Sequence, residues 1–234
     1  SLRERLAPGF NNIIYNRLLP DLEKNLKENH NIDLFPYVDL KEKTPKEGIV
    51  AFNDLPRYAM GYGSLFHSIS FTVETHMLKP FPERVEATLA FMKELINWTS
   101  LNKSSIENSR NKARRFVIES PYLKYNYSNS YKKDSILFNG YEHSFPIHKI
   151  TGLKRLKYDT TKPYTSYVPY YNIFTAKDSV KTPDLYYISA QEKDIIKRLK
   201  ANKVEMKMIN KDTLMLLGVY RVVKFSPSKK PYEG

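Results

Sequence analysis

The amino-acid sequence predicts an α/β region followed by a mostly β region with one helix. In residues 1–98, apolar residues recur at helical spacing, and short apolar runs lie between these segments. From residue 121 onward, short runs of β-forming residues are separated by Pro, Gly, Asn and Asp. The charge also changes: residues 1–98 contain 12 Lys and Arg against 13 Asp and Glu, whereas residues 99–234 contain 26 against 12. We therefore expect two domains, over residues 1–98 and 121–234, joined by a helical linker over 99–120.

The first region opens with a predicted helix over residues 11–28. Pro20 lies inside this segment and predicts either a kink or a division into two shorter helices, because proline cannot donate a backbone hydrogen bond. The helix has an apolar stripe at i, i+4 spacing, which consists of Ile14, Leu18, Leu22 and Leu26.

Shorter elements follow this helix. Residues 35–40 and 49–52 favour short strands on either side of a polar loop over 41–48. Residues 58–68 favour a helix, although the glycines within that range weaken the prediction.

A strand and a long helix complete the first region. Residues 69–73 are typical of a buried strand, and residues 79–82 of a loop. Pro82 is well placed as the first residue of the next helix. Its apolar positions at helical spacing are Val85, Leu89, Met92 and Ile96.

The second region has four runs typical of strands, one helix and a final hairpin. The helix is expected over residues 191–202. The hairpin combines strands over 204–208 and 213–223 with a turn over 210–212. The four earlier strands are expected over residues 122–127, 135–138, 166–171 and 185–189.

Composition excludes several classes of protein. Hydrophobic residues make up 41% of the chain, enough for a sizeable core, and no apolar run approaches the 18 residues of a membrane span. The absence of cysteine excludes disulfides, thiolate metal sites and a thiol nucleophile. The sequence also lacks the glycine-rich loops that bind nucleotides and the Gly-x-Ser-x-Gly elbow of serine hydrolases.

Two stretches carry the most specific signal in the chain, Pro56-Arg-Tyr-Ala-Met-Gly-Tyr62 and Phe71-Thr-Val-Glu-Thr-His-Met-Leu-Lys-Pro-Phe81. Together they resemble the C-terminal part of the catalytic domain of the zinc metallocarboxypeptidases (carboxypeptidase A-like), in particular a branch of large bacterial enzymes. The resemblance implies a carboxypeptidase-like mixed sheet with helices over residues 1–98. It also implies a hydrolase that removes C-terminal residues from peptide substrates.

The resemblance assigns roles to individual residues. Glu74 matches the general base of the family, which acts on zinc-bound water. Arg57, Tyr58 and Tyr62 are candidates for substrate binding, since a guanidinium holds a carboxylate and a phenol donates to a substrate. An ion pair for the arginine and ordinary aromatic packing for the tyrosines remain the alternatives. His76 is a candidate for supporting the base through a hydrogen bond, with a purely structural role as its alternative.

The zinc ligands of the family have no counterpart in this sequence. The family uses a His and a Glu separated by two residues, and a third His further on. None of the five histidines here is followed three residues later by Glu. We therefore expect no metal site in this chain, which would be an inactive fragment on its own. The zinc would be bound in the intact parent enzyme by the missing N-terminal part of the catalytic domain.

Residues from about 121 onward resemble the accessory region that follows the peptidase domain in the bacterial branch, and the chain is expected to be truncated at its end. Enzymes of the family are usually exported, so a secreted or periplasmic location is expected. Two alternatives remain. One is a non-catalytic peptidase homologue. The other is a module that binds an acidic glycan or another polyanion, with nucleic acid the less favoured ligand. The residues that best fit the polyanion-binding module form a local cluster of aromatic and basic side chains. They are Tyr164, Tyr167, Tyr170 and Tyr171, with Lys154, Arg155, Lys157 and Lys162.

Overall fold

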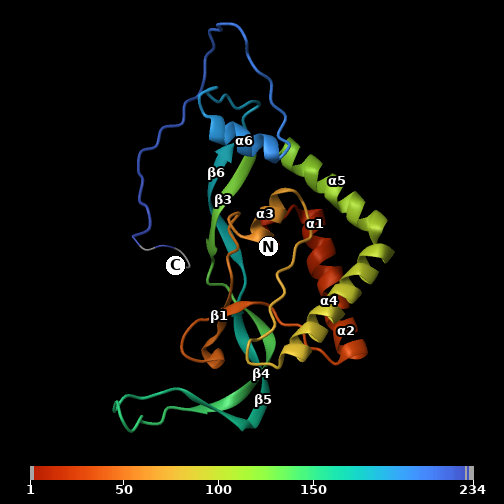
Figure 1. Ribbon diagram of the computed structural model, residues 1–234, viewed down its shortest axis with the longest axis vertical. Helices are drawn as coiled ribbons and strands as arrows, with labels where there is room; N and C mark the ends of the chain where they lie inside the picture. Colours follow the sequence, from red (N-terminus) through yellow and green to blue (C-terminus); the bar gives the residue numbers. More distant parts are fainter. Residues whose placement is uncertain (1–2, 230, 232–234) are drawn as a thin grey trace. The chain divides into compact units, whose positions relative to one another are not determined.

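A computed structural model describes residues 3–229 and 231. The chain divides into two compact units, Ser1–Pro183 and Asp184–Gly234. The first unit contains helices, a mixed four-stranded sheet and an antiparallel two-stranded sheet, which confirms the mixed α/β class (Figure 1). Within the described residues, no helix is both long and apolar enough to cross a bilayer.

The predicted N-terminal helix is present, and Pro20 alters its middle. After the short turn η1 (Arg3–Arg5), α1 (Pro8–Ile13) leads into the π-helical segment η2 (Ile14–Leu18), and α2 (Leu19–His30) follows. The backbone N–H of Leu19 bonds to the carbonyl of Ile14, five residues back. A wider turn of this kind accommodates a proline that cannot donate its own hydrogen bond.

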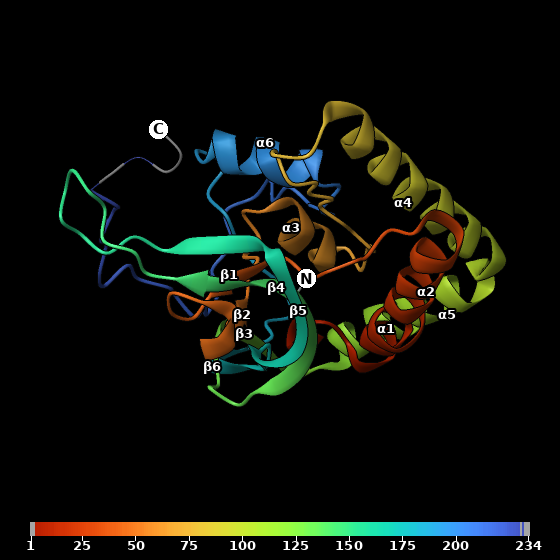
Figure 2. The same ribbon diagram turned by 90° about the horizontal axis from the view of Figure 1, so that it is seen from below.

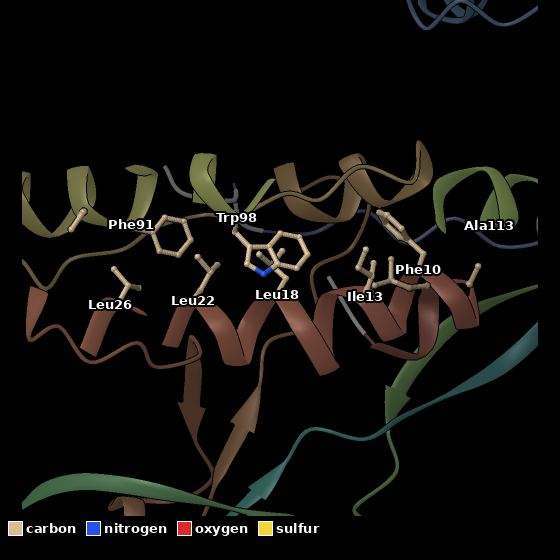
Figure 3. Close-up of a cluster of buried hydrophobic side chains, with 11 residues drawn as sticks. Phe10, Ile13, Leu18, Leu22, Leu26, Phe91, Trp98 and Ala113 are labelled. Carbon is tan, nitrogen blue, oxygen red and sulfur yellow. The ribbon is translucent and has the colours of Figure 1, made fainter. Parts of the chain in front are cut away.

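Two further helices cover this segment. They are α4 (Phe81–Leu101) and α5 (Lys103–Glu119). Figure 3 shows Leu18, Leu22 and Leu26 pointing from α2 and η2 toward Phe91 and Trp98 of α4. The stripe predicted from sequence therefore forms the main core of the first unit.

The mixed sheet has the strand order β1-β2-β5-β4. Strand β2 (Ile49–Ala51) runs parallel to β5 (Lys157–Tyr171), and β1 (Val38–Leu40) and β4 (Asp134–Ser144) are antiparallel to their neighbours. The second sheet pairs β3 (Tyr122–Asn129) with β6 (Phe174–Lys181). Figure 2 shows the same arrangement from below, with β4 and β5 running together as a long ribbon. Two short elements remain: η3 (Pro45–Glu47) lies between β1 and β2, and α3 (Ala59–Leu65) lies between β2 and α4.

The division of the chain differs from the predicted one. Residues 99–120 are helical, as expected, but the boundary between the compact units lies after Pro183. Because β2 and β5 share one sheet, strand pairing crosses the expected linker. Ala113 of α5 is also buried in the core cluster, so this helix packs against the unit.

The described part of the second unit contains one helix, α6 (Lys193–Ala201), where one was predicted. The strands predicted over residues 185–189, 204–208 and 213–223 are wrong for this structure, because those residues pair with no strand. Among the described residues of this unit none is buried, so it provides no core on which a hairpin could pack. The expected turn over 210–212 joins two extended segments that do not pair with each other.

Candidate functional site

Glu74 lies in the segment that connects α3 to α4. The strand predicted over residues 69–73 is wrong, because these residues pair with no other strand in the described part of the chain. The start of the segment is nevertheless anchored, since Phe71 packs edge-to-face on Phe91 with ring centroids 5.3 Å apart. Ile69 also packs against the core cluster. The segment therefore leaves the core after Phe71 and carries Glu74 to the surface.

The carboxylate of Glu74 is exposed. Within residues 3–229 and 231 it has no hydrogen bond and no ion pair. His76 takes part in a local turn: its Nδ1 accepts a 3.2 Å hydrogen bond from the N–H of Leu78, and its carbonyl accepts one from Lys79. No hydrogen bond joins His76 to Glu74, so this geometry favours the structural role for the histidine.

The candidate substrate-binding residues lie at the start of α3. The Arg57 guanidinium is 5.6 Å from the ring centroid of Tyr58, and the Tyr58 ring packs at 5.1 Å against Phe52. Tyr62 packs against Phe66 with centroids 5.2 Å apart. The structure thus brings Arg57 and Tyr58 together. No contact recorded among the described residues connects either of them, or Tyr62, to Glu74.

The two glycines of α3 explain how this helix fits its surroundings. A Cβ atom on Gly61 would lie 2.6 Å from the carbonyl carbon of Leu55, and one on Gly63 would collide with the hydroxyl of Ser70. Glycine therefore permits a close approach of backbone to backbone at Gly61, and of backbone to the Ser70 side chain at Gly63. The hydroxyl of Ser64 also donates a 2.7 Å hydrogen bond to the Gly61 carbonyl. Of these contacts, the one between Gly63 and Ser70 brings the start of the Glu74 segment close to α3.

A small cavity lies beside this segment. Its volume is about 80 Å³. Burial raises the pKa of Tyr15, which lines the cavity, above the ordinary value of a phenol. The remaining lining residues are mostly apolar: Leu6, Ile14, Leu19, Met60, Ser68, Ile69, Ser70 and Phe71. The cavity is large enough for a few waters and too small for a peptide side chain with its backbone.

The described residues contain no group of three or more His, Asp or Glu that could hold a metal ion. His30, the only histidine followed three residues later by an acid, directs its Nε2 to Glu94 at 3.0 Å instead. His30 therefore joins α2 to α4.

The tyrosine cluster of the polyanion alternative is divided by the fold. Tyr171 is buried and its hydroxyl accepts a 2.8 Å hydrogen bond from Lys41, which lowers the pKa of the phenol. Burial raises the pKa of Tyr170 to about 12. Lys46 covers the ring of Tyr164 at 5.1 Å, and Tyr167 alone of the four is largely exposed. Tyr171 therefore serves packing, Tyr164 and Tyr170 are partly buried, and Tyr167 is the ring most accessible to a ligand.

Sequence reasoning missed the buried carboxylate of Asp54. Asp54 is almost fully buried and its Oδ1 lies 3.6 Å from a guanidinium nitrogen of Arg5, which also bonds to the Asp54 carbonyl. The same arginine donates to Asn53 and lies 5.7 Å from the Tyr127 ring centroid. Nothing local in the sequence signals this network, because its members are up to 122 residues apart.

Comparison of the chain with protein-family models, with curated proteins and with solved structures finds no match.

Proposed function

We propose that this chain forms the C-terminal part of the catalytic domain of a zinc carboxypeptidase, together with the region that follows it. The observation that carries the proposal is the local resemblance of residues 56–62 and 71–81 to that family. Glu74, the residue matched to the general base, lies on an extended, exposed segment.

The surface of α4 gives the proposal independent support. This helix is apolar on two sides. One side, with Phe91 and Trp98, faces the core. The other side remains about half exposed and consists of Val85, Leu89, Met92 and Ile96. An apolar helix face of this extent ordinarily packs against another layer of protein. The missing part of a catalytic domain would supply that layer.

In the proposed reaction, Glu74 acts as a general base. Its carboxylate takes a proton from the water that attacks the last peptide bond, and it then gives this proton to the departing amine. A bound zinc ion would polarise the water and the peptide carbonyl. Arg57, through its planar guanidinium, is suited to hold a substrate carboxylate, and Tyr58 and Tyr62 to line the site.

The intact protein, with the residues that precede Ser1, tests this function. We expect those residues to contain a His-x-x-Glu pair and a later His. We also expect the purified protein to release C-terminal amino acids from a peptide, to lose this activity to a chelator and to regain it with zinc. Zinc bound without any release of amino acids would favour the non-catalytic homologue, and absence of both zinc and activity would refute the proposal.

A further inference from the structure

The β4–β5 ribbon ends in a strongly basic turn. We define the hairpin tip as residues 143–158, which contain no Asp or Glu. Four Lys and Arg side chains are exposed there, and the two histidines of the tip are partly buried. The cations are Lys149, Lys154, Arg155 and Lys157. Such an acid-free run concentrates positive charge at one end of the first unit.

Three aliphatic side chains are exposed at the same end. Ile147 is 67% exposed, Ile150 90% and Leu153 69%. These residues belong to a turn with regular hydrogen bonds: the N–H of His148 donates to the carbonyl of Leu153 at 2.9 Å, and that of Gly152 to the carbonyl of His148 at 2.9 Å. The exposure therefore belongs to a defined conformation of the turn.

The turn has local features that fix this conformation. Gly152 adopts a φ of 66°, in the left-handed region that glycine enters without strain. Ile147 and Lys154 form a β-bridge, and the N–H of Arg155 donates to the carbonyl of Pro146 at 3.0 Å. Below the turn, the His143 ring packs at 5.5 Å against Phe145. The β4–β5 ribbon thus holds aliphatic and cationic side chains together on a short, ordered projection.

We propose that the hairpin tip binds the surface of an anionic lipid bilayer. In this arrangement Ile147, Ile150 and Leu153 enter the boundary between headgroups and acyl chains. Lys and Arg side chains extend their charged ends to the lipid phosphates and carboxylates while their stems remain in apolar surroundings. This binding is peripheral and is independent of the proposed peptidase activity.

The side chains present favour a bilayer over a nucleic acid. Exposed aliphatic groups gain nothing from a sugar–phosphate backbone, and proteins that bind single strands present aromatic rings for base stacking. The turn between Pro146 and Arg155 contains no Phe, Tyr or Trp, and the two rings that flank it in the tip, Phe145 and Tyr158, are 39% and 40% exposed. Further along the ribbon, Tyr164 is covered by Lys46 and Tyr171 is buried, so that Tyr167 is the one largely exposed ring of the tyrosine cluster. Charge and apolar exposure together therefore match an anionic interface.

Co-sedimentation with lipid vesicles tests this proposal on the whole chain. Vesicles of phosphatidylcholine are compared with vesicles that also contain phosphatidylserine, at low and at high salt. We expect binding to the anionic vesicles only, and weaker binding at high salt because ions screen the attraction. The double variant K154Q/R155Q should bind about 25-fold more weakly, since each cation near such a surface contributes about a factor of five.

Two further double variants separate the contributions. I150S/L153S keeps every charge and should lose about tenfold or more in affinity, because it removes the apolar contact with the interface. K112Q/R115Q removes two exposed cations from α5 and should bind like the unchanged protein. A substitution I150W should give a blue-shifted emission on anionic vesicles, relative to the unchanged protein with its single Trp98.

Several results would overturn the proposal. They are equal binding to neutral and anionic vesicles, absence of binding to both, full affinity of I150S/L153S, and equal losses in K154Q/R155Q and K112Q/R115Q. Tip-dependent binding to single-stranded DNA without binding to vesicles would assign the surface to nucleic acid instead. Far-UV circular dichroism of each variant verifies that the fold is unchanged.

Discussion

The Nε2 atom of His30 lies 3.0 Å from the Oε1 atom of Glu94, so that the last turn of α2 is joined to the middle of α4. Asn29 donates a 3.1 Å hydrogen bond to the same oxygen. Glu94 is buried, and the hydrogen bonds from Asn29 and then His30 lower the pKa of its carboxyl group below the ordinary value. A charged carboxylate in the interior is therefore held by two neighbouring residues.

Acid should weaken this connection. Because the pKa of Glu94 is lower in the folded than in the unfolded chain, its contribution to stability is complete above the unfolded pKa of about 4.3. It is lost as the pH falls through the lower pKa of the folded state. Thermal unfolding of the protein and of Glu94→Gln at about pH 6 and about pH 3 should show a melting-temperature difference that shrinks in acid. A difference that stays constant with pH would contradict this account.

Leu22 should be among the residues on which stability most depends. It is fully buried between α2 and α4, where its side chain contacts the core around Phe91 and Trp98 (Figure 3). Leu22→Ala should reduce the free energy of unfolding by about 2–5 kcal/mol, because the substitution removes apolar contacts and leaves a cavity. Leu101→Ala, at an 86% exposed position in the last turn of α4, is the matched control and should change it by less than about 0.5 kcal/mol. Urea denaturation measures the free energy of unfolding of both variants. An equal decrease in the two would contradict the placement of Leu22 in the core.

Two glycines in helices should respond in opposite directions to the same substitution. Gly61→Ala would place a methyl group against the backbone of Asp54 and Leu55, so it should destabilise the protein. Gly9 of α1 has open space around it, and Gly9→Ala should stabilise the protein by about 0.5–1 kcal/mol through helix propensity. Thermal unfolding of the two variants compares these effects. If the Gly61→Ala variant were as stable as the unchanged protein, α3 would not approach the backbone of residues 54–55 as closely as described.

Amide hydrogen exchange should distinguish the two units. The residues of β4 and β5 are paired along their length, whereas residues 205–229 follow α6 without strand partners or buried side chains. We therefore expect exchange in 205–229 to be faster than in the β4–β5 ribbon. Slow exchange on alternate residues of 204–208 and 213–223 would instead support the hairpin that the sequence pattern predicts.

Local patterns predicted the helices because their evidence lies within a few turns of the chain. Leu18, Leu22 and Leu26 recur at helical spacing, and all three are buried. In α4, however, the predicted apolar positions Val85 and Leu89 are half exposed, and Phe91 on another side faces the core. A helix that is apolar on two sides gives no indication from its own sequence of which side packs first.

Strand pairing and buried charges depend on distant residues. The parallel pairing of Ile49 with Tyr170 joins segments more than 100 residues apart, and no local pattern specifies it. The ion pair between Arg5 and Asp54 also joins residues that are far apart in the sequence, and no local pattern specifies it. For the candidate site, the motif identified Glu74, but the strand expected to carry it needs neighbours that the described chain does not provide. β-propensity alone does not form a strand without such partners.

Turnover by a Glu74→Gln variant of the intact protein tests the central claim most directly. The amide keeps the size of the side chain and cannot act as a base. We predict that release of C-terminal residues falls by about 10²–10⁴-fold while the zinc content stays unchanged. The matched control Glu86→Gln, which replaces an exposed carboxylate on α4, should retain full activity. Undiminished turnover by Glu74→Gln, in a protein that binds zinc and is active, would contradict the assignment of Glu74 as the general base.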